Sequence, residues 1–386
     1  MIYSFGANNY FSFKDGFDIS FALNSKVPKS ISLGRKVSTV IGIKGANASG
    51  KTNILQSYEF ISSFCTRSFS RAEGSLNYVS GFYDSKEPCE FYVDFEAADS
   101  RYIYELSITK NEVLREALYK KVSRKTLIVE RRYNEITQRS SDMSALDLLV
   151  LKKNASLIDT VKQYKLDLRS KDFEVVHKFF DSCNGNVSSL SVLDDKDIFS
   201  YERVNKYYHN IPDAFTFTKN IIRKCDLGVT DIKLYERKDD EGKPEYYPIF
   251  FHGSKSNPDR WLTYHNESHG TTALYRRLRV YWEILNSGGT LVMDEFDTNL
   301  HPDLLPMIID LFLNVETNPN NAQFIFTAHS LEIIDHLGKY RTVLVGKEEG
   351  ESFCYRLDEI PGDIIRNDRS ISALYSDGKI GGVPRL

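Results

Sequence analysis

The feature that most constrains this chain is one eight-residue run, GANASGKT at residues 45–52. It fits the pattern G-x-x-x-x-G-K-[ST] at each required position. A β-branched run, VSTVIGI at residues 37–43, comes before it, and apolar residues at helical spacing follow from Lys51 to about Phe64. Glycines let such a loop curl so that backbone N–H groups point at phosphate oxygens, and the helix dipole favours the same anion. The sequence therefore predicts a strand, a phosphate-binding loop and a helix.

The polar positions of this loop have predicted roles. Lys51 supplies a mobile positive charge for the β and γ phosphates of ATP, and the Thr52 hydroxyl is a hard oxygen ligand for Mg²⁺. ATP and Mg²⁺ are therefore the expected cofactors. The residues of this segment that we expect to contact the nucleotide are Gly45, Asn47, Ser49, Gly50, Lys51, Thr52 and Asn53.

A second run, LVMDE, is an apolar segment that ends in Asp294 and Glu295. Two adjacent carboxylates repel each other, so this pair is costly to build for structure alone. In a chain that also carries a phosphate loop, the pair predicts a catalytic strand end. We expect Asp294 to hold the Mg²⁺ shell and Glu295 to polarise the attacking water as general base.

Two further runs carry candidate phosphate ligands. FIFTAHS begins as an apolar segment and contains His329 near its polar end. A lone histidine is usually structural, but one at the carboxyl end of a strand in this sheet is placed to contact a γ-phosphate. ESHGT opens a helix with Ser268 and Gly270, and a helix N-terminus of this kind makes an anion site. A plain N-cap by Ser268 or Thr271 is the alternative interpretation.

The pattern along the chain predicts an α/β fold with a mostly parallel sheet, because strands alternate with helices at both ends. The middle differs: aromatic and β-branched runs from about Glu90 to Tyr133 predict a β-meander, and helical spacing follows from about Asp142 to Cys225. Within it, Asn184–Ser189 reads as a loop. We therefore divide the chain into a nucleotide-binding core, residues 1–80 and 226–386, and an inserted region, residues 81–225.

Composition narrows the setting. The net charge is −3 and the pI about 6.3, which does not favour a nucleic-acid-binding protein, although a local basic patch stays open. The five cysteines form no CxxC pair, which argues against structural disulfides and zinc. The N-terminus lacks the order of a signal peptide, and no apolar run approaches the roughly 20 residues of a membrane helix. We expect a cytoplasmic protein without a membrane partner.

In this order the four motifs resemble those of the ABC-type ATPases. More narrowly, the chain resembles the ABC/SMC-like ATPases of bacterial defence and abortive-infection loci. These AAA-family proteins include relatives of the OLD family and the ATPase subunit of PARIS-type systems. The resemblance rests on YSFGANNYFSFKD, GANASGKTN, ESHGT, LVMDEFDTNLHP, FTAHS and LYSDGKIGGVP, which span both ends of the chain.

The resemblance implies further roles. Ser268 and Gly270 would form the signature that completes the ATP site of another protomer in a head-to-tail dimer. Asp297 and Asn299 would form the D-loop, which faces the opposite protomer, and His329 would be the switch histidine.

The chain also departs from the family pattern. No Gln stands between Thr66 and Lys110, where ABC ATPases usually carry the Gln of the Q-loop, and His269 replaces a second signature Gly, which argues against a transporter ATPase. OLD-type proteins add a C-terminal Toprim nuclease, for which we expect no room after His329.

Two functions follow. The first is a defence ATPase, a dimer or larger assembly that senses infection and controls a separately encoded effector. The alternative is an SMC- or RecF-like DNA-binding repair ATPase; against it, the middle region lacks the sustained heptads of a coiled coil. A nucleotide-gated scaffold without turnover is disfavoured by Glu295. The sequence leaves open whether DNA, RNA or protein is bound.

Overall fold

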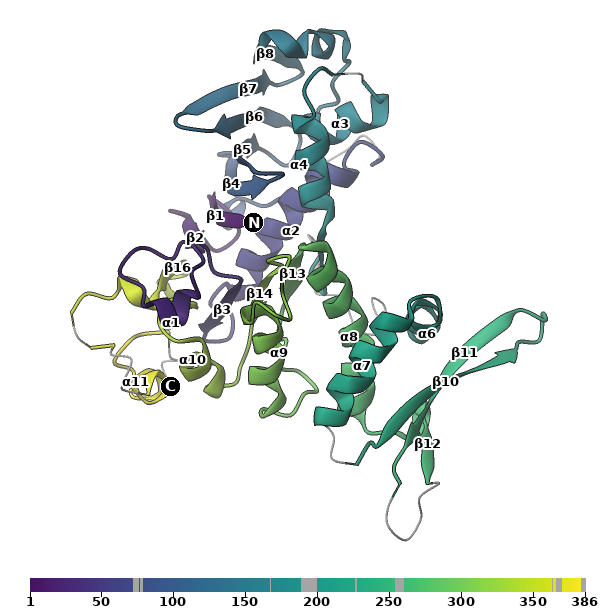
Figure 1. Cartoon of the computed structure of the whole chain (residues 1–386). Coiled ribbons are helices and arrows are strands. Elements are labelled where there is room, and N and C mark those ends of the chain that lie inside the picture. Colours follow the sequence, from purple (N-terminus) through teal and green to yellow (C-terminus); the bar gives the residue numbers. More distant parts are fainter. Residues whose placement is uncertain are drawn as a thin grey trace.

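The computed structural model describes residues 1–71, 76, 79–166, 168–188, 200–225, 228–253, 260–362, 364–365 and 370–382. Within them the chain forms three sheets and the helices that cover them (Figure 1). The mixed α/β fold that the sequence predicts is confirmed.

The six-stranded sheet carries the motifs and is parallel except for β16. Its central strands are buried on both faces, as expected for a parallel sheet between helices. Parallel strands place their carboxyl ends at one edge, so the segments after β3, β13 and β14 meet there. In spatial order the strands are β16 (Glu351–Arg356), β15 (Thr342–Glu348), β3 (Val40–Gly45), β14 (Gln323–Thr327), β13 (Thr290–Met293) and β9 (Cys183–Gly185).

Strand β9 corrects one expectation, because the sequence analysis assigned residues 184–189 to a loop. Asn184 and Gly185 instead pair in parallel with Leu291 and Val292 of β13. A Cβ at Gly185 would lie 1.7 Å from the Val292 carbonyl oxygen, so only glycine allows this approach.

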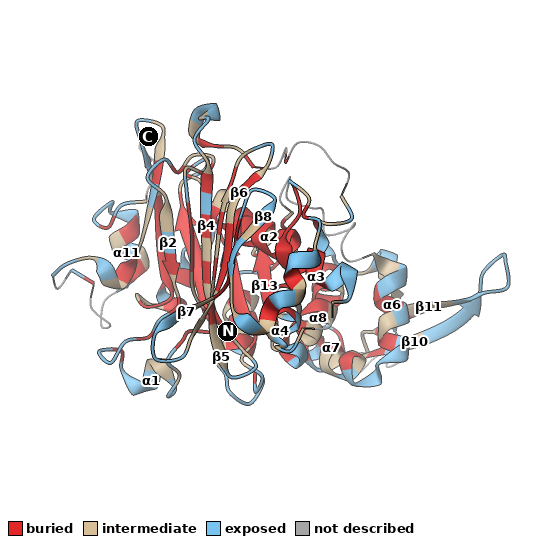
Figure 2. Cartoon of the chain, turned by 90° about the horizontal axis from the view of Figure 1, so that it is seen from above, coloured by how far each residue is buried: buried red, intermediate tan, exposed pale blue. Residues whose placement is uncertain are grey.

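The predicted meander is confirmed as part of a seven-stranded antiparallel sheet. Burial alternates along its strands, so that one face packs on helices and the other faces solvent (Figure 2). The sheet also takes in the first two strands of the chain, so its ladder crosses the division predicted at residue 80. In order the strands are β2 (Phe17–Ser20), β1 (Ile2–Asn8), β4 (Cys89–Ala97), β5 (Ser100–Ile108), β6 (Val113–Lys121), β7 (Lys125–Arg132) and β8 (Glu135–Arg139).

The helices form two groups. Helix α2 (Lys51–Arg67) lies between the two large sheets, and α3 (Leu157–Tyr164) and α4 (Asp172–Asp181) pack against it. Helices α6 (Tyr201–Asn210) and α7 (Pro212–Cys225) pack instead against α8 (His269–Ser287). The predicted helical region therefore contributes to both groups.

Beside α6 and α7 a three-stranded sheet projects from the body (Figure 1). Its strands are β10 (Asp231–Lys238), β11 (Pro244–Phe251) and β12 (Trp261–Thr263). The turn predicted at residues 238–243 joins β10 to β11, whereas most of the turn predicted at residues 253–260 lies outside the described residues.

The other helices of the described residues have at most ten residues each. They are α1 (Lys29–Ser32), α9 (Leu304–Leu313), α10 (Glu332–Leu337), α11 (Ile371–Ser376) and the 3₁₀ turns Phe82–Asp84, Ser141–Leu148, Tyr264–Asn266 and Leu357–Glu359. Asp335 of α10 accepts the N–H groups of Ile371 and Ser372, so it holds the start of α11. None of the helices in the described part of the chain combines the length and apolar character that crossing a membrane requires.

Candidate nucleotide site

The phosphate loop joins β3 directly to α2, as predicted. Gly50 has φ 106°, and a Cβ there would lie 2.8 Å from Ser12 Oγ and 2.9 Å from Ser352 Oγ. At Gly45 a Cβ would lie 2.3 Å from the Val345 carbonyl oxygen. Gly45 is required because a side chain there would collide with the backbone of β15, and Gly50 because its φ lies in the region that favours glycine.

Inside the loop, polar groups are gathered where an anion would bind. Lys51 Nζ donates to the carbonyl oxygens of Gly45 at 3.0 Å and Ala46 at 2.9 Å. Burial lowers the pKa of Lys51, while Asp294 and Glu295 act to raise it. Ser49 Oγ is buried without a hydrogen-bond partner. A buried hydroxyl of this kind has hydrogen-bonding capacity to offer a phosphate oxygen.

The two asparagines of the loop differ in setting. Asn47 is exposed at the turn, whereas Asn53 lies on α2. Asn53 Oδ1 accepts a hydrogen bond from Ser12 Oγ at 3.1 Å, and its amide donates to Gln56 at 3.2 Å. Asn53 thus links α2 to the segment between β1 and β2.

Thr52 and Asp294 meet across the sheet edge. Thr52 Oγ1 donates to Asp294 Oδ2 at 2.7 Å, and Thr327 donates to Asp294 Oδ1. Asp294 is 5% exposed. A hydroxyl and a carboxylate this close can both reach one small cation.

Asn186, which the sequence analysis missed, fixes Asp294 from the other side. Its amide nitrogen donates to the Asp294 carbonyl oxygen at 2.9 Å, and its Oδ1 accepts from the Asp294 N–H at 2.8 Å. Thr327 was missed too, although it stands at the end of the predicted FIFTAHS strand. Asn186 lies in none of the motifs, and the FTAHS motif drew attention to His329 and not to Thr327; both residues act through contacts distant in sequence.

These residues fit Mg²⁺. Among the described residues, no three His, Cys, Asp or Glu side chains gather in a way that could hold a metal. Mg²⁺ needs no such cage, since it commonly takes one or two protein oxygens and completes its shell with water and phosphate. Thr52 and Asp294 would hold it here.

Glu295 and His329 stand together at the same edge. His329 Nε2 lies 3.3 Å from Glu295 Oε1, and the two side chains are 47% and 57% exposed. Glu295 has φ 47°, an uncommon value for a residue with a side chain, and its N–H donates to Thr327 Oγ1 at 2.8 Å. A strained backbone at such a position is typical of functional sites.

Asp297 turns toward the segment after β14. Its Oδ2 accepts the N–H groups of His329 and Ser330, each at 2.8 Å, and its Oδ1 is buried without a hydrogen-bond partner. Asn299 is exposed with φ 63°. The structure thus connects Asp297 to His329 within one chain; its facing an opposite protomer stays a prediction.

Ser268 and Gly270 lie apart from this cluster. Ser268 Oγ accepts the Thr271 N–H at 3.1 Å, so the N-cap interpretation is confirmed. A Cβ on Gly270 would meet only the Asn299 carbonyl oxygen, at 3.5 Å, so the fold of one chain does not require glycine there. Among described residues, no hydrogen bond joins Ser268 or Gly270 to the phosphate loop.

The signature instead lines a small hollow of about 440 Å³, together with His301 and Asp303. Both of these side chains are largely exposed. The predicted site residues therefore fall into two groups, one at the sheet edge and one at the start of α8.

A second hollow, of about 330 Å³, adjoins the phosphate loop. Phe11, Phe82, Tyr83 and Lys347 line it together with Asn53. Tyr83 is 76% exposed, and Lys347 Nζ lies 3.5 Å from the Ala48 carbonyl oxygen. Phe82 and Tyr83 lie outside the motifs, and Phe11 lies in the YSFGANNYFSFKD stretch without a role assigned to it from sequence.

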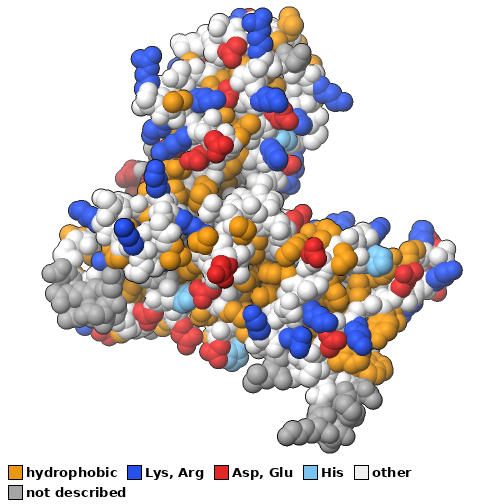
Figure 3. All heavy atoms as spheres, in the orientation of Figure 1, with side chains coloured by type: hydrophobic (Ala, Val, Ile, Leu, Met, Phe, Trp, Pro, Cys, Tyr) orange, Lys and Arg blue, Asp and Glu red, His pale blue; other side chains and the backbone are white. Residues whose placement is uncertain are grey.

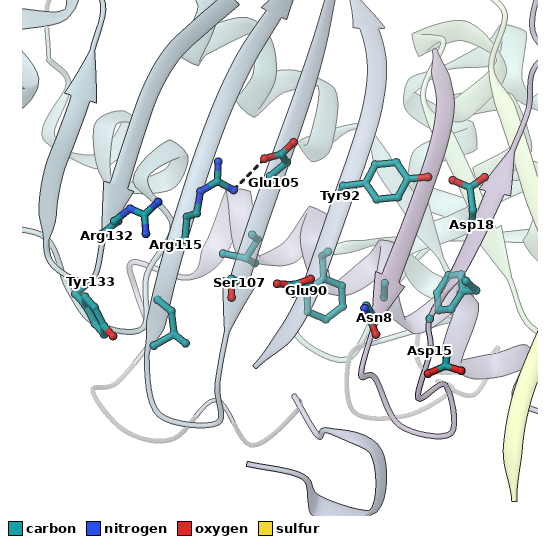
Figure 4. A pocket seen from close by; sticks show the side chains of 16 residues that line it. Asn8, Asp15, Asp18, Glu90, Tyr92, Glu105, Ser107, Arg115, Arg132 and Tyr133 are labelled. Atoms are coloured by element: carbon teal, nitrogen blue, oxygen red, sulfur yellow. Dashed lines mark hydrogen bonds and ion pairs between the residues drawn. The ribbon is translucent and has the colours of Figure 1, made fainter. Parts of the chain in front are cut away.

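A larger hollow, of about 800 Å³, lies over the solvent-facing side of the seven-stranded sheet (Figure 4). Asp15, Asp18 and Glu90 line one side and Arg115 and Arg132 the other. No residue of the phosphate loop takes part, so this hollow is separate from the candidate nucleotide site.

Two solved structures are similar to this chain over most of its length. The SMC head domain from Thermotoga maritima is 15% identical with a TM-score of 0.45, covering 92% of this chain and 98% of that one. The SMC head bound to the C-winged helix domain of ScpA is 16% identical with a TM-score of 0.45, covering 92% and 96%. No curated protein matches the chain.

One family model matches residues 40–335, more than half of the chain, and it covers the phosphate loop, the Asp294–Glu295 pair and His329. The chain therefore belongs to the family of AAA domains described as "putative AbiEii toxin, Type IV TA system".

Proposed function

We propose that the protein is a Mg²⁺-dependent ATPase. The observation that carries this proposal is the 2.7 Å contact between Thr52 and Asp294, with Glu295 next in sequence and 3.3 Å from His329. Phosphate loop, metal ligands and candidate base thus converge at one sheet edge. This is the arrangement that phosphoryl transfer to water requires, because catalysis there depends on positioning and charge stabilisation.

Each side chain has a task in this proposal. Mg²⁺ supplies positive charge beside the phosphates when bound. Lys51 leaves the carbonyls of its own loop and contacts the β and γ phosphates. Glu295 accepts a proton from the attacking water, and His329, held against Glu295, contacts the γ-phosphate. The hollow lined by Phe11, Phe82 and Tyr83 receives the adenine ring of ATP, since aromatic side chains stack on nucleobases.

We further propose that two chains share each ATP site head to tail. Ser268 and Gly270 are separate from the phosphate loop within one chain, and nothing local demands glycine at 270. Both facts are expected if Gly270 must leave space for a nucleotide bound to another chain. Asp297 and Asn299 would lie at the same junction.

The biological role we propose is control of a separately encoded effector in antiphage defence. The family's description, which names a toxin–antitoxin system, supports it. The β-meander and helical region of residues 81–225 is the proposed contact with that effector. The rival repair function is distinguished by measuring whether double-stranded DNA binds the protein and stimulates hydrolysis.

Turnover itself is tested with Glu295→Gln. This change keeps the shape of the side chain and removes the base, so ATP binding stays and hydrolysis falls by about 10²–10⁴-fold. Glu316→Gln, an exposed change outside the site, is the control. Near-normal hydrolysis in Glu295→Gln would remove Glu295 from the role of general base. If the unaltered protein does not hydrolyse ATP, the ATPase proposal is rejected.

A further inference from the structure

A buried lysine outside all the motifs lies next to the phosphate loop. Lys44 precedes Gly45 on β3 and is 8% exposed. A buried ammonium group is costly unless it is paired or hydrogen-bonded. Lys44 Nζ donates to the backbone carbonyl oxygen of His329, and it lies 5.9 Å from the centre of the Tyr375 ring on α11.

The backbone N–H of His329, on the other side of that residue, is bound by Asp297. Asp297 Oδ2 accepts the His329 N–H at 2.8 Å, while Lys44 binds the His329 carbonyl. Both backbone groups of the histidine are thus bound by charged side chains. Asp297 Oδ1 is buried without a hydrogen-bond partner, so the positive charge of Lys44 also compensates a partly buried carboxylate.

We propose that Lys44 is a positioning residue: with Asp297 it clamps the backbone of His329 and so fixes the imidazole against Glu295. The inference rests on the proposed ATP hydrolysis. The ring of His329 is half exposed, and the contact that orients it is the 3.3 Å approach to Glu295. Because the imidazole is half exposed, its orientation depends strongly on the position of the His329 backbone.

The position of Lys44 gives the clamp a second consequence. Lys44 and Gly45 are adjacent on one strand, and His329 follows the neighbouring strand β14. The clamp therefore connects the strand that carries the phosphate loop to the segment that carries His329.

The ammonium group of Lys44 titrates near pH 8. Four groups face Lys44: Asp297 after β13, Lys51 on α2, His329 after β14 and Tyr375 on α11. The pKa of Lys44 is lowered to about 8, mainly by burial, with Asp297 acting to raise it and Lys51 acting to lower it. The ammonium is therefore present below about pH 8 and is lost as the pH rises through that value.

The test compares Lys44→Met, which keeps the length and removes the charge, with Lys339→Met. Lys339 Nζ donates to the Ile365 carbonyl oxygen and is half-buried, so it is a matched control away from the histidine. We expect Lys44→Met to bind ATP within about twofold of the unaltered protein and to lose about 10–100-fold in kcat, the scale of a misplaced catalytic group. Lys44→Arg, which keeps the charge, should recover part of the loss.

Two readouts separate positioning from a general structural effect. The kcat of the unaltered protein should fall between pH 7.5 and 9, and this fall should be missing in Lys44→Met. The imidazole NMR signals of His329, assigned with His329→Gln and recorded without nucleotide, should shift and broaden in Lys44→Met alone.

Equal losses in the Lys44 and Lys339 variants, or unchanged His329 signals in Lys44→Met, overturn the proposal. If the unaltered protein does not turn over ATP, the proposed function fails, but the NMR comparison still decides the role of Lys44.

Discussion

The two halves of the candidate site differ in how much of their surroundings one chain provides. At the sheet edge, Asp294 alone receives contacts from Thr52, Thr327 and Asn186. At the start of α8, the hydrogen bonds of Ser268 among described residues are local to the helix start, and a Cβ on Gly270 would meet one atom at ordinary contact distance. The first half is built before any ligand arrives. The second has the exposure expected of a surface that works on another molecule.

Figure 3 extends the comparison to the surface of one face. Hydrophobic side chains gather over the central part and on the projecting lobe, whereas the upper lobe carries Lys and Arg interspersed with Asp and Glu. The upper lobe holds the meander of residues 89–139. A mixed-charge surface suits a polar, releasable contact, which agrees with placing the effector contact there.

The largest effect should come from a substitution that distorts the phosphate loop. Gly50→Ala places a Cβ against Ser12 Oγ and Ser352 Oγ at an unfavourable φ, so we expect a loss of at least about 100-fold in ATP affinity. Gly34→Ala is the matched control, since Gly34 also has positive φ but nothing within 4 Å. It should cost about 1 kcal/mol of stability and leave binding intact. Equal binding by the two variants, measured by calorimetry, contradicts this account of the loop.

The signature should behave in the opposite way. The free chain has room for a side chain at position 270, so Gly270→Asp should change the free energy of unfolding by no more than about 0.5 kcal/mol. Its ATP affinity should stay within about twofold of that of the unaltered protein. Hydrolysis should fall by about 10²-fold, because a carboxylate would face the phosphates of the neighbouring chain. Measuring binding and turnover on one preparation checks this split. A parallel loss of both would mean that Gly270 serves its own chain.

A smaller effect is expected at Asn186. Asn186→Ala leaves the backbone N–H and C=O of Asp294 without their partner, at a cost of about 1–3 kcal/mol. Turnover should fall as well, because Asp294 is no longer fixed. Asn184→Ala removes one hydrogen bond, to the Gly185 N–H, and serves as control. Thermal unfolding of both variants tests the difference, and a milder effect at Asn186 than at Asn184 would show that the two Asn186 bonds to the Asp294 backbone are unimportant.

An effect of similar size concerns the pH dependence of stability. The pKa of Lys44 is about 8 in the folded chain and 10.5 ordinarily, so between these values the unfolded chain binds more protons. The unaltered protein should therefore gain stability relative to Lys44→Met as the pH rises from 8 to 10, by on the order of 2 kcal/mol. Activity should fall over the same range, so the two curves move in opposite directions. Denaturant titrations at several pH values provide the check.

The sequence predicted the features that depend on local patterns and missed those that depend on contacts between distant segments. The phosphate loop, the acid pair and the alternation of strands and helices were readable, because motif spacing and periodicity are local. Strand β9 was not: three residues, Cys-Asn-Gly, carry no period, and they pair with β13 more than 100 positions later. Lys44, Asn186 and Thr327 share this property, since their role exists only once distant strands are adjacent.

The central claim is that each ATP site takes its phosphate loop from one chain and its signature from another. It is tested most directly by mixing Lys51→Ala chains with Gly270→Asp chains, each inactive alone. A mixed dimer then has one site with both defects and one with neither. At equal mixing about half of the dimers are mixed, so activity should return to about a quarter of that of the unaltered protein. No recovery at any ratio, with mixed dimers verified by native mass spectrometry, would contradict the claim.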